Sequence, residues 1–256
     1  MGKMRIVILG SGTSMGVPIA GCDCRVCLSQ DPKDNRLRTS CYIQKDGVDI
    51  LIDTSVDYRQ QMLRAGIKRL DAVIYTHHHV DHILGMDDLR SFNLLHKTSI
   101  PLYGMTETMH NIKRVFSYAF AESPYASSLP KLTIHEIDDR PFEINGIEII
   151  PIPLFHGKMP VLGFRVGDFA YCTDVSHIPE TSYERLTGLK VLILDALRHK
   201  PHPTHFNIEQ AIQESQKIGA QSTYFTHVSH QVMHQETEDS LPEGIHLGYD
   251  GLEFEL

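Results

Sequence analysis

Four histidines and one aspartate stand within the seven residues 76–82, Thr-His-His-His-Val-Asp-His, and no other feature constrains this chain as strongly. The segment follows the apolar run 72–75, so its side chains lie where a predicted buried strand ends. Because alternate side chains of an extended or turning backbone share one side, His77 and His79 can bind one metal ion while Asp81 and His82 reach a second. A solvated loop or an engineered tag can also be rich in histidine, but here an acid interrupts the imidazoles. The spacing therefore predicts a metal site.

The order His-x-His-x-Asp-His resembles the metallo-β-lactamase superfamily of metal-dependent hydrolases, whose members carry three further ligands at separate strand ends. Those ligands are a histidine, a bridging aspartate and a last histidine, and His156, Asp174 and His227 follow apolar runs in that order. The resemblance implies the following ligand set: His77, His79 and His156 on one divalent ion, Asp81, His82 and His227 on the other, and Asp174 between them.

A pair of divalent ions implies hydrolysis as the chemistry. Two such ions roughly 3.5–4 Å apart can share a water, lower its pKa toward about 7 and hold both the attacking and the leaving oxygen. Flavin-dependent di-iron relatives carry a glutamate where His79 stands, which disfavours an iron oxidoreductase. Imidazole ligands favour Zn²⁺ whereas carboxylate and phosphate ligands suit Mn²⁺, so the sequence leaves the active-site metal open between these two.

A hairpin is predicted over residues 40–52, because Asp46-Gly47 separates two apolar runs and glycine supplies the positive φ of a tight turn. Asp53 ends its second strand. In the resembling superfamily an aspartate at this place hydrogen-bonds the metal-binding imidazoles, and such carboxylates fix the imidazole tautomer. The alternative is an acid at the N-terminus of the helix predicted over 57–65.

Three of the five cysteines, Cys22, Cys24 and Cys27, lie within six residues, while the other two lie inside apolar runs. This clustering indicates a metal site in a reducing compartment rather than disulfides. A closed structural zinc site needs a fourth ligand, and His230 is the best candidate. A redox dithiol is the alternative.

The cysteine cluster after a glycine-rich first loop, together with Thr-His-Val-Ser-His-Gln at 226–231, resembles the PhnP-type phosphodiesterases of the bacterial carbon-phosphorus lyase pathway. That resemblance implies a phosphodiesterase for small or cyclic phosphodiesters, with 5-phosphoribosyl 1,2-cyclic phosphate as one substrate. It also implies a histidine just before a helix as the general acid, and His205 fits this place. We expect His205 and Asp81 to act in catalysis, and His199 and His202 to contact phosphate or solvent.

Two other functions stay open. In tRNA 3′-processing endonucleases the strand before this loop ends in His-Glu-Ala-Thr, whereas residues 195–198 here read Asp-Ala-Leu-Arg. The net charge of −8 and the lack of a long basic run also disfavour a nucleic-acid substrate. A zinc protein of cofactor biosynthesis shares the cysteine cluster and binds without hydrolysing, but its active-site ligands are degenerate.

Two groups of strands, each followed by helices, predict one domain over residues 1–256: an αββα sandwich of two packed mixed sheets with helices on the outer faces. The resemblance implies the same fold. Helices are predicted over 57–65, 84–95, 106–120 and 208–218, a second sheet from residue 132 onward, and a closing hairpin over 246–256. No apolar run approaches the roughly 20 residues of a membrane span and no signal peptide is visible, so we expect a cytoplasmic protein with no membrane partner. A homodimer stays open.

Overall fold

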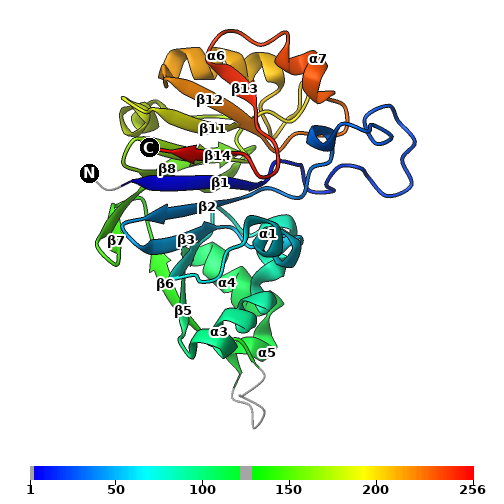
Figure 1. The fold of residues 1–256 in the computed structure, drawn as a ribbon. Helices are drawn as coiled ribbons and strands as arrows, with labels where there is room; N and C mark the ends of the chain where they lie inside the picture. The colour runs from blue at the N-terminus through cyan, green and yellow to red at the C-terminus, as the bar shows by residue number, and fades with distance from the viewer. Residues whose placement is uncertain (1–2, 122–128) are drawn as a thin grey trace.

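The computed structural model describes residues 3–121 and 129–256, which form two packed seven-stranded sheets with helices on both outer faces (Figure 1). In spatial order the first sheet contains β14 (Glu253–Glu255), β1 (Met4–Gly10), β2 (Ser40–Lys45), β3 (Val48–Ile52), β4 (Ala72–Ile74), β5 (Ile100–Met105) and β6 (Leu132–Ile137). The second contains β13 (Ile245–Leu247), β12 (Ser222–Thr226), β11 (Val191–Asp195), β10 (Phe169–Cys172), β9 (Met159–Val166), β8 (Ile147–His156) and β7 (Phe142–Ile144). Both sheets are mixed, which confirms the predicted sandwich.

Side-chain alternation along the strands builds the layers. In β3, Ile50 and Ile52 pack in the core between the sheets, where Phe164 and Tyr171 meet them from the second sheet. The intervening Leu51 packs on the outer face of the first sheet. A strand buried on both faces reads as a continuous apolar run, which explains why its sequence lacks polar alternation.

Helices cover both outer faces (Figure 1). The first sheet is covered by α1 (Tyr58–Ala65), α3 (Arg90–His96), α4 (Thr106–Val115) and α5 (Ser117–Phe120). The second is flanked by α6 (Ile208–Ile218) and α7 (His234–Glu238). Helix α6 begins at a capping box of Asn207 and Gln210 and ends at Gly219 in the left-handed conformation, so its predicted bounds are confirmed. Among the described residues, no helix combines the length and hydropathy needed to cross a membrane.

The helix predicted over 106–120 is interrupted at Phe116, between α4 and α5. Three further predictions about the elements were wrong. The helix predicted over 84–95 is divided into a 3₁₀ segment, Leu84–Leu89, and α3, because Gly85 passes so close to Ser55 that a Cβ there would lie 2.3 Å from the Ser55 carbonyl oxygen. Strand β6, predicted to open the second sheet, pairs in parallel with β5 in the first. A helical crossover from β5 favours this parallel neighbour.

The third wrong prediction was the closing hairpin over 246–256. Its two strands join different sheets: β13 pairs with β12 and β14 pairs with β1. Between them the Gly248 N–H donates to the Phe225 carbonyl and the Gly251 N–H to the Ile8 carbonyl, both at 2.8 Å. Asp250-Gly251 therefore crosses from one sheet to the other. The hairpin predicted over 40–52 is confirmed, with Asp46 and Gly47 at φ of 50° and 79°.

Candidate metal centres

Six strand ends converge at one edge of the sandwich and supply most of the candidate site. These residues are Asp53 after β3, His77 after β4, His156 at the end of β8, Asp174 after β10, Asp195 at the end of β11 and His227 after β12. Three of them, Asp53, Asp174 and His227, have positive φ of 62°, 55° and 60°. A non-glycine residue in this region is held there by its surroundings, and such residues cluster at functional sites.

The first group of ligand atoms consists of Asp81, His82, Asp174 and His227, all buried. The Nε2 atom of His82 lies 3.3 Å from both Asp81 Oδ2 and Asp174 Oδ1. The Nε2 atom of His227 lies 3.3 Å from Asp174 Oδ2 and 3.7 Å from Asp81 Oδ2. Ligands about 2.1 Å from a tetrahedral metal are separated by about 3.4 Å, so these four atoms fit around one ion.

The second group shares Asp174. Ligand atoms of His77, His79 and Asp174 lie within 4.8 Å of one another, and Nε2 of His77 is 3.9 Å from Asp174 Oδ2. The imidazole of His156 completes this side, with its ring centroid 5.1 Å from that of His79 and 5.8 Å from that of His77. His78 belongs to neither group.

Buried nitrogen atoms without partners test whether these residues suit metal ions. Among the described residues, Nε2 of His77, His82 and His227 is buried and has no hydrogen-bond partner. Burial lowers the pKa of His77 and His79, which favours neutral imidazole, the form that binds metal. Although burial opposes it, the imidazoles of His227 and His82 hold the pKa of the Asp174 carboxyl well below its usual range. Imidazole and carboxylate groups together form a donor set that fits divalent ions.

Hydrogen bonds fix the other ring nitrogen of two of these histidines. Asp53 Oδ2 accepts from His82 Nδ1 at 2.7 Å, and the same carboxylate accepts from the N–H and hydroxyl of Thr76 at 2.8 Å. His156 Nδ1 donates to the Thr204 carbonyl at 2.7 Å. Each bond places the proton on Nδ1 and leaves Nε2 directed at the site, which is how outer hydrogen bonds orient metal ligands. Asp53 does not cap α1, whose N-cap is Asp57.

His205 lies at the same edge, and Asp195 holds it. The Nδ1 atom of His205 donates to Asp195 Oδ2 at 2.7 Å, and its ring stacks on His227 with centroids 4.6 Å apart. Ligand atoms of His205, His156 and Asp174 also cluster. The sequence reasoning missed Asp195. Its position at the end of a buried strand, like that of Asp53, was the signal that could have found it.

The two other histidines of this loop, His202 and His199, lie in different surroundings. The ring of His202 lies 5.1 Å from that of His205, so it borders the site. His199 instead has Nε2 3.4 Å from the Thr237 hydroxyl and lines a cavity beside the cysteine cluster with Cys24 and His230. The structure therefore brings His202 to the predicted site and places His199 elsewhere.

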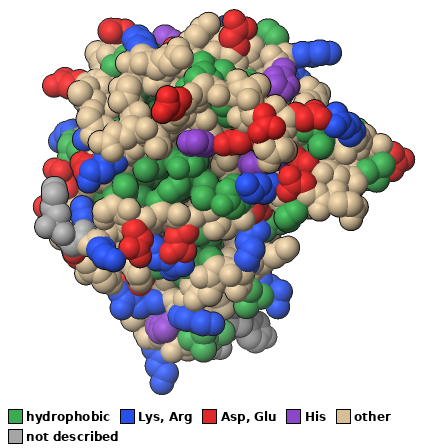
Figure 2. All heavy atoms as spheres, turned by 45° about the horizontal axis from the view of Figure 1, so that its top comes forward, with side chains coloured by type: hydrophobic (Ala, Val, Ile, Leu, Met, Phe, Trp, Pro, Cys, Tyr) green, Lys and Arg blue, Asp and Glu red, His purple; other side chains and the backbone are tan. Residues whose placement is uncertain are grey.

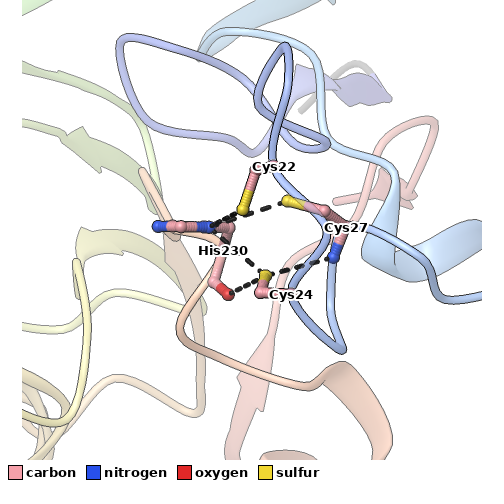
Figure 3. A group of neighbouring side chains, drawn as sticks. All are labelled: Cys22, Cys24, Cys27 and His230. Carbon is pink, nitrogen blue, oxygen red and sulfur yellow. Dashed lines mark hydrogen bonds between the residues drawn. The ribbon is translucent and has the colours of Figure 1, made fainter.

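The second centre is formed by Cys22, Cys24, Cys27 and His230 (Figure 3). The His230 Nδ1 atom lies 3.4, 3.4 and 3.6 Å from the sulfur atoms of Cys22, Cys24 and Cys27. Tetrahedral zinc with Zn–S of about 2.3 Å and Zn–N of about 2.0–2.1 Å separates nitrogen and sulfur by about 3.6 Å. The Cys27 backbone N–H lowers the pKa of Cys24 to about 6, whereas burial raises the pKa of Cys27 to about 11. The geometry fits a closed zinc site.

Gly10 and Gly12 let the chain at the end of β1 pack closely against residues 36–38. A Cβ on Gly10 would lie 2.0 Å from the Arg38 carbonyl oxygen, and one on Gly12 would lie 2.8 Å from Arg36 Cβ. On its other side this loop pairs with Val228, whose N–H donates to the Ser11 carbonyl and whose carbonyl accepts from the Thr13 N–H. The cysteine-bearing loop thereby reaches the segment that carries His230.

Several known proteins are similar to this chain over most of its length. A family model described as a beta-lactamase superfamily domain matches residues 49–228. A protein of Porphyromonas gingivalis named octanoyltransferase is 43% identical over 254 residues, 98% of this chain but 51% of that protein, so the chain spans about half of its length. A crystal structure described as a new diphosphatase from the PhnP family is 46% identical, with a TM-score of 0.94, over 99% of this chain and 97% of that one.

Two more distant structures share the fold. Zn²⁺-bound PqqB from Methylobacterium extorquens is 20% identical with a TM-score of 0.78, over 98% of this chain and all of its own. The short form of human tRNase Z is 18% identical with a TM-score of 0.71, over 98% of each chain. Both likenesses extend over nearly the whole chain.

Proposed function

The chain belongs to the beta-lactamase superfamily, and from this premise we propose that it is a dinuclear metal-dependent phosphodiesterase acting on small or cyclic phosphodiesters. The position of Asp174 carries the proposal. Its carboxylate is shared by the group containing Asp81, His82 and His227 and by the group containing His77 and His79. A carboxylate common to two nitrogen-rich groups suits a bridge between two ions.

In this proposal His77, His79 and His156 hold one ion, Asp81, His82 and His227 hold the other, and Asp174 contacts both. Two divalent ions bound there would supply Lewis-acid activation of a water and of a phosphoryl oxygen. The protein contributes the orientation of its ligands: Asp53 fixes His82 and the Thr204 carbonyl fixes His156. The three thiolates and His230 would hold a structural zinc.

His205 is placed to protonate the leaving oxygen. Its Nδ1–H donates to Asp195, so the proton available for transfer is the one that Nε2 carries when the ring is protonated, at the edge of the candidate metal centre. A phosphodiester with an alkoxide leaving group needs such a donor, and a histidine held by a carboxylate meets that need. Asp195 acts here as a positioning residue.

The solved relative described as a diphosphatase favours a second substrate class. A substituted diphosphate and a phosphodiester both present a phosphorus atom with an ester-like leaving oxygen, so the same residues could serve both. Octanoyl transfer we assign to the half of the P. gingivalis protein that this chain does not match. An acyl-enzyme needs an accessible, activated nucleophile. In this proposal Cys22, Cys24 and Cys27 are committed to the structural zinc, whereas Cys41 and Cys172 are fully buried and burial raises the pKa of both thiols.

Charge also bears on the tRNA alternative. On the face shown in Figure 2 the described basic and acidic side chains are interspersed, and the basic ones form no continuous track there. A protein that follows a phosphate backbone usually presents such a track. This face therefore offers no continuous basic path for a phosphate backbone.

Turnover of a panel of substrates tests the proposal. Protein loaded with Zn²⁺ or Mn²⁺ should hydrolyse bis(p-nitrophenyl) phosphate and small cyclic phosphodiesters, and substituted diphosphates if the second class holds. Asp174→Ala should abolish this activity, whereas His78→Ala, a histidine of the same segment outside both groups, should retain it. Loaded protein that turns over none of these substrates would contradict the proposal, and cleavage of precursor tRNA alone would favour the endonuclease alternative.

A further inference from the structure

The candidate dinuclear centre takes its ligands from both sheets, so its geometry depends on how the sheets are fixed to each other. His77 follows β4 of the first sheet, whereas Asp174 and His227 follow β10 and β12 of the second. A metal site needs its ligands held to within about 0.5 Å. Apolar packing between the sheets is non-directional, so a directional contact close to these ligands would add precision.

Three hydroxyl groups form a contact of this kind. Tyr171 of β10 and Thr226 at the end of β12 belong to the second sheet, and Thr39 immediately precedes β2 of the first. The Thr39 Oγ1 atom lies 2.8 Å from the Tyr171 hydroxyl oxygen and 3.0 Å from Thr226 Oγ1. A hydroxyl can donate one hydrogen bond and also accept. Tyr171, Thr39 and Thr226 therefore form one hydroxyl network between the sheets.

Core packing alone does not explain the hydroxyl network. Thr39 is 1% exposed, and Tyr171 and Thr226 are fully buried. Tyr171 packs among apolar side chains of both sheets, including Ile52 and Phe164. A buried hydroxyl is costly when it has no partner, whereas phenylalanine and valine have nearly the same shapes as tyrosine and threonine without that need. Three hydroxyls at these positions indicate a requirement for direction.

The second-sheet members of the hydroxyl network lie beside metal ligands in the sequence. Thr226 immediately precedes His227, and Tyr171 lies three residues before Asp174. Within the described residues neither ring nitrogen of His227 has a hydrogen-bond partner, and its backbone has a φ of 60°. The direction of this imidazole therefore depends on where the backbone before it is held. The hydrogen bond between Thr226 and Thr39 holds that backbone from the first sheet.

The residue after Thr39 has a similar place on the first-sheet side. The Ser40 hydroxyl lies 3.0 Å from the Ile52 carbonyl oxygen and 2.9 Å from the Asp53 carbonyl oxygen. The carboxylate of Asp53 accepts from His82 Nδ1 at 2.7 Å. The start of β2 thus contacts the segment that orients a first-sheet ligand and, through Thr39, the segment that carries His227.

We propose, resting on the function proposed above, that Tyr171, Thr39 and Thr226 are positioning residues that hold the ligand-bearing strand ends of the two sheets at the spacing that metal binding requires. None of the three is a candidate ligand. They act through His227 and Asp174, so their loss changes the affinity for metal. Hydrogen-bonded residues behind metal ligands typically change that affinity by about 10- to 100-fold, and an indirect network belongs at the lower end.

A matched pair at position 39 tests the central hydroxyl. Thr39→Val keeps the shape and removes both hydrogen bonds, whereas Thr39→Ser keeps the hydroxyl. In a chelator competition Thr39→Val should bind Mn²⁺ about tenfold more weakly than wild type, and Thr39→Ser should bind it nearly as tightly as wild type. Mn²⁺ reports on the histidine cluster, because thiolates select zinc whereas carboxylates suit Mn²⁺.

Tyr42→Phe is the control for a general loss of stability. Tyr42 is buried on the outer face of the first sheet, and its hydroxyl donates to Asp49. This variant also loses a buried hydrogen bond, so its melting temperature should fall while its Mn²⁺ affinity stays at the wild-type value.

A triple variant with Thr39→Val, Tyr171→Phe and Thr226→Val separates position from stability. Replacing all partners of a buried network by apolar groups of the same shape can be nearly neutral for stability. The triple variant should therefore melt near the wild-type temperature and still bind Mn²⁺ about tenfold more weakly. It also decides the question if Thr39→Val alone does not fold.

Failure of this inference differs from failure of the proposed function. Wild-type Mn²⁺ affinity in the triple variant, or an equal loss of affinity in Tyr42→Phe and Thr39→Val, would overturn the positioning role and leave the phosphodiesterase standing. If the wild type binds Mn²⁺ but hydrolyses no phosphodiester, while Thr39→Val binds Mn²⁺ more weakly than Thr39→Ser, the positioning role holds and the phosphodiesterase falls.

Discussion

Replacing His205 with alanine should slow hydrolysis of a sugar phosphodiester far more than hydrolysis of bis(p-nitrophenyl) phosphate. Protonation of a leaving oxygen contributes about 10²–10⁴-fold to a rate. A nitrophenolate departs readily as an anion and needs little of this help, whereas an alkoxide needs all of it. We therefore expect a loss of about 100-fold or more on a cyclic ribose phosphodiester without a terminal phosphate, and less than about tenfold on the nitrophenyl ester.

The same substitution affects stability, and the structure gives its size. His205 is buried, and alanine in its place leaves Asp195 Oδ2 with the Val175 N–H at 2.8 Å alone. The other oxygen, Oδ1, already has no partner among the described residues. Under-satisfying a buried acceptor costs about 1–3 kcal/mol of unfolding free energy, so the alanine variant should also melt at a lower temperature.

Asparagine at position 205 separates the two effects. Its side-chain amide can take the place of Nδ1 and donate to Asp195, but it offers no proton at the position of Nε2. His205→Asn should therefore show the same dependence on the leaving group with a smaller loss of stability. The assay is kcat/KM on both substrates for wild type and both variants, with metal content and melting temperature measured on the same samples, and His199→Ala as the comparison. An equal loss on both substrates would refute the role of His205 as an acid and assign it to binding the shared phosphate.

Three further predictions concern the ligands. Asp174→Ala should lower the metal content at both positions of the dinuclear centre, measured by plasma emission, because its carboxylate belongs to both groups. Cys24→Ser should lose about one zinc and lower the melting temperature, because a closed site couples metal binding to folding. Asp53→Asn should weaken metal binding by about 10- to 100-fold in a chelator competition, because its carboxylate orients His82 at 2.7 Å.

Each of these has an outcome that contradicts it. Unchanged metal content with full activity in Asp174→Ala would remove this residue from the bridge. If Cys24→Ser keeps its zinc and differs from wild type only under oxidising conditions, the thiols form a redox site. Wild-type metal affinity in Asp53→Asn would mean that backbone geometry alone orients His82.

The candidate metal ligands could be predicted because their signal is local. His77, His79, Asp81 and His82 share one short segment, and each remaining ligand follows a strand whose apolar run is visible in the sequence. Strand ends converge when strands share a sheet edge, and the resemblance to the superfamily indicated which of these strand ends carry ligands. The turn at Asp46-Gly47 was predictable for the same reason, because the two residues that adopt positive φ are themselves the sequence signal of the turn.

The predictions that were wrong or missing concern features that depend on contacts between segments far apart in the sequence. Nothing near residue 85 in the sequence indicates that Gly85 packs against the Ser55 carbonyl and divides the predicted helix. The exchange of the last two strands between sheets depends on Gly248 and Gly251 meeting Phe225 and Ile8, which are far away in the chain. The hydrogen bond between His205 and Asp195 was not predicted, because the two residues are ten positions apart and face each other only in the folded loop.

The two candidate metal centres are connected through residues 226–231, so a zinc ion bound by the cysteine cluster would also constrain the histidine cluster. Unlike His82, His156 and His205, His227 has no hydrogen bond to either ring nitrogen within the described residues, so no side chain fixes its orientation in that way. The orientation of His227 depends instead on its backbone, which has positive φ, and on the stacking of its ring on His205. The next residue, Val228, forms backbone hydrogen bonds with the glycine-rich loop. His230, three residues beyond His227, lies against the three cysteines. A cation bound by the cysteine centre would therefore fix the segment that carries His227 on its C-terminal side, and its loss should loosen that ligand before any other.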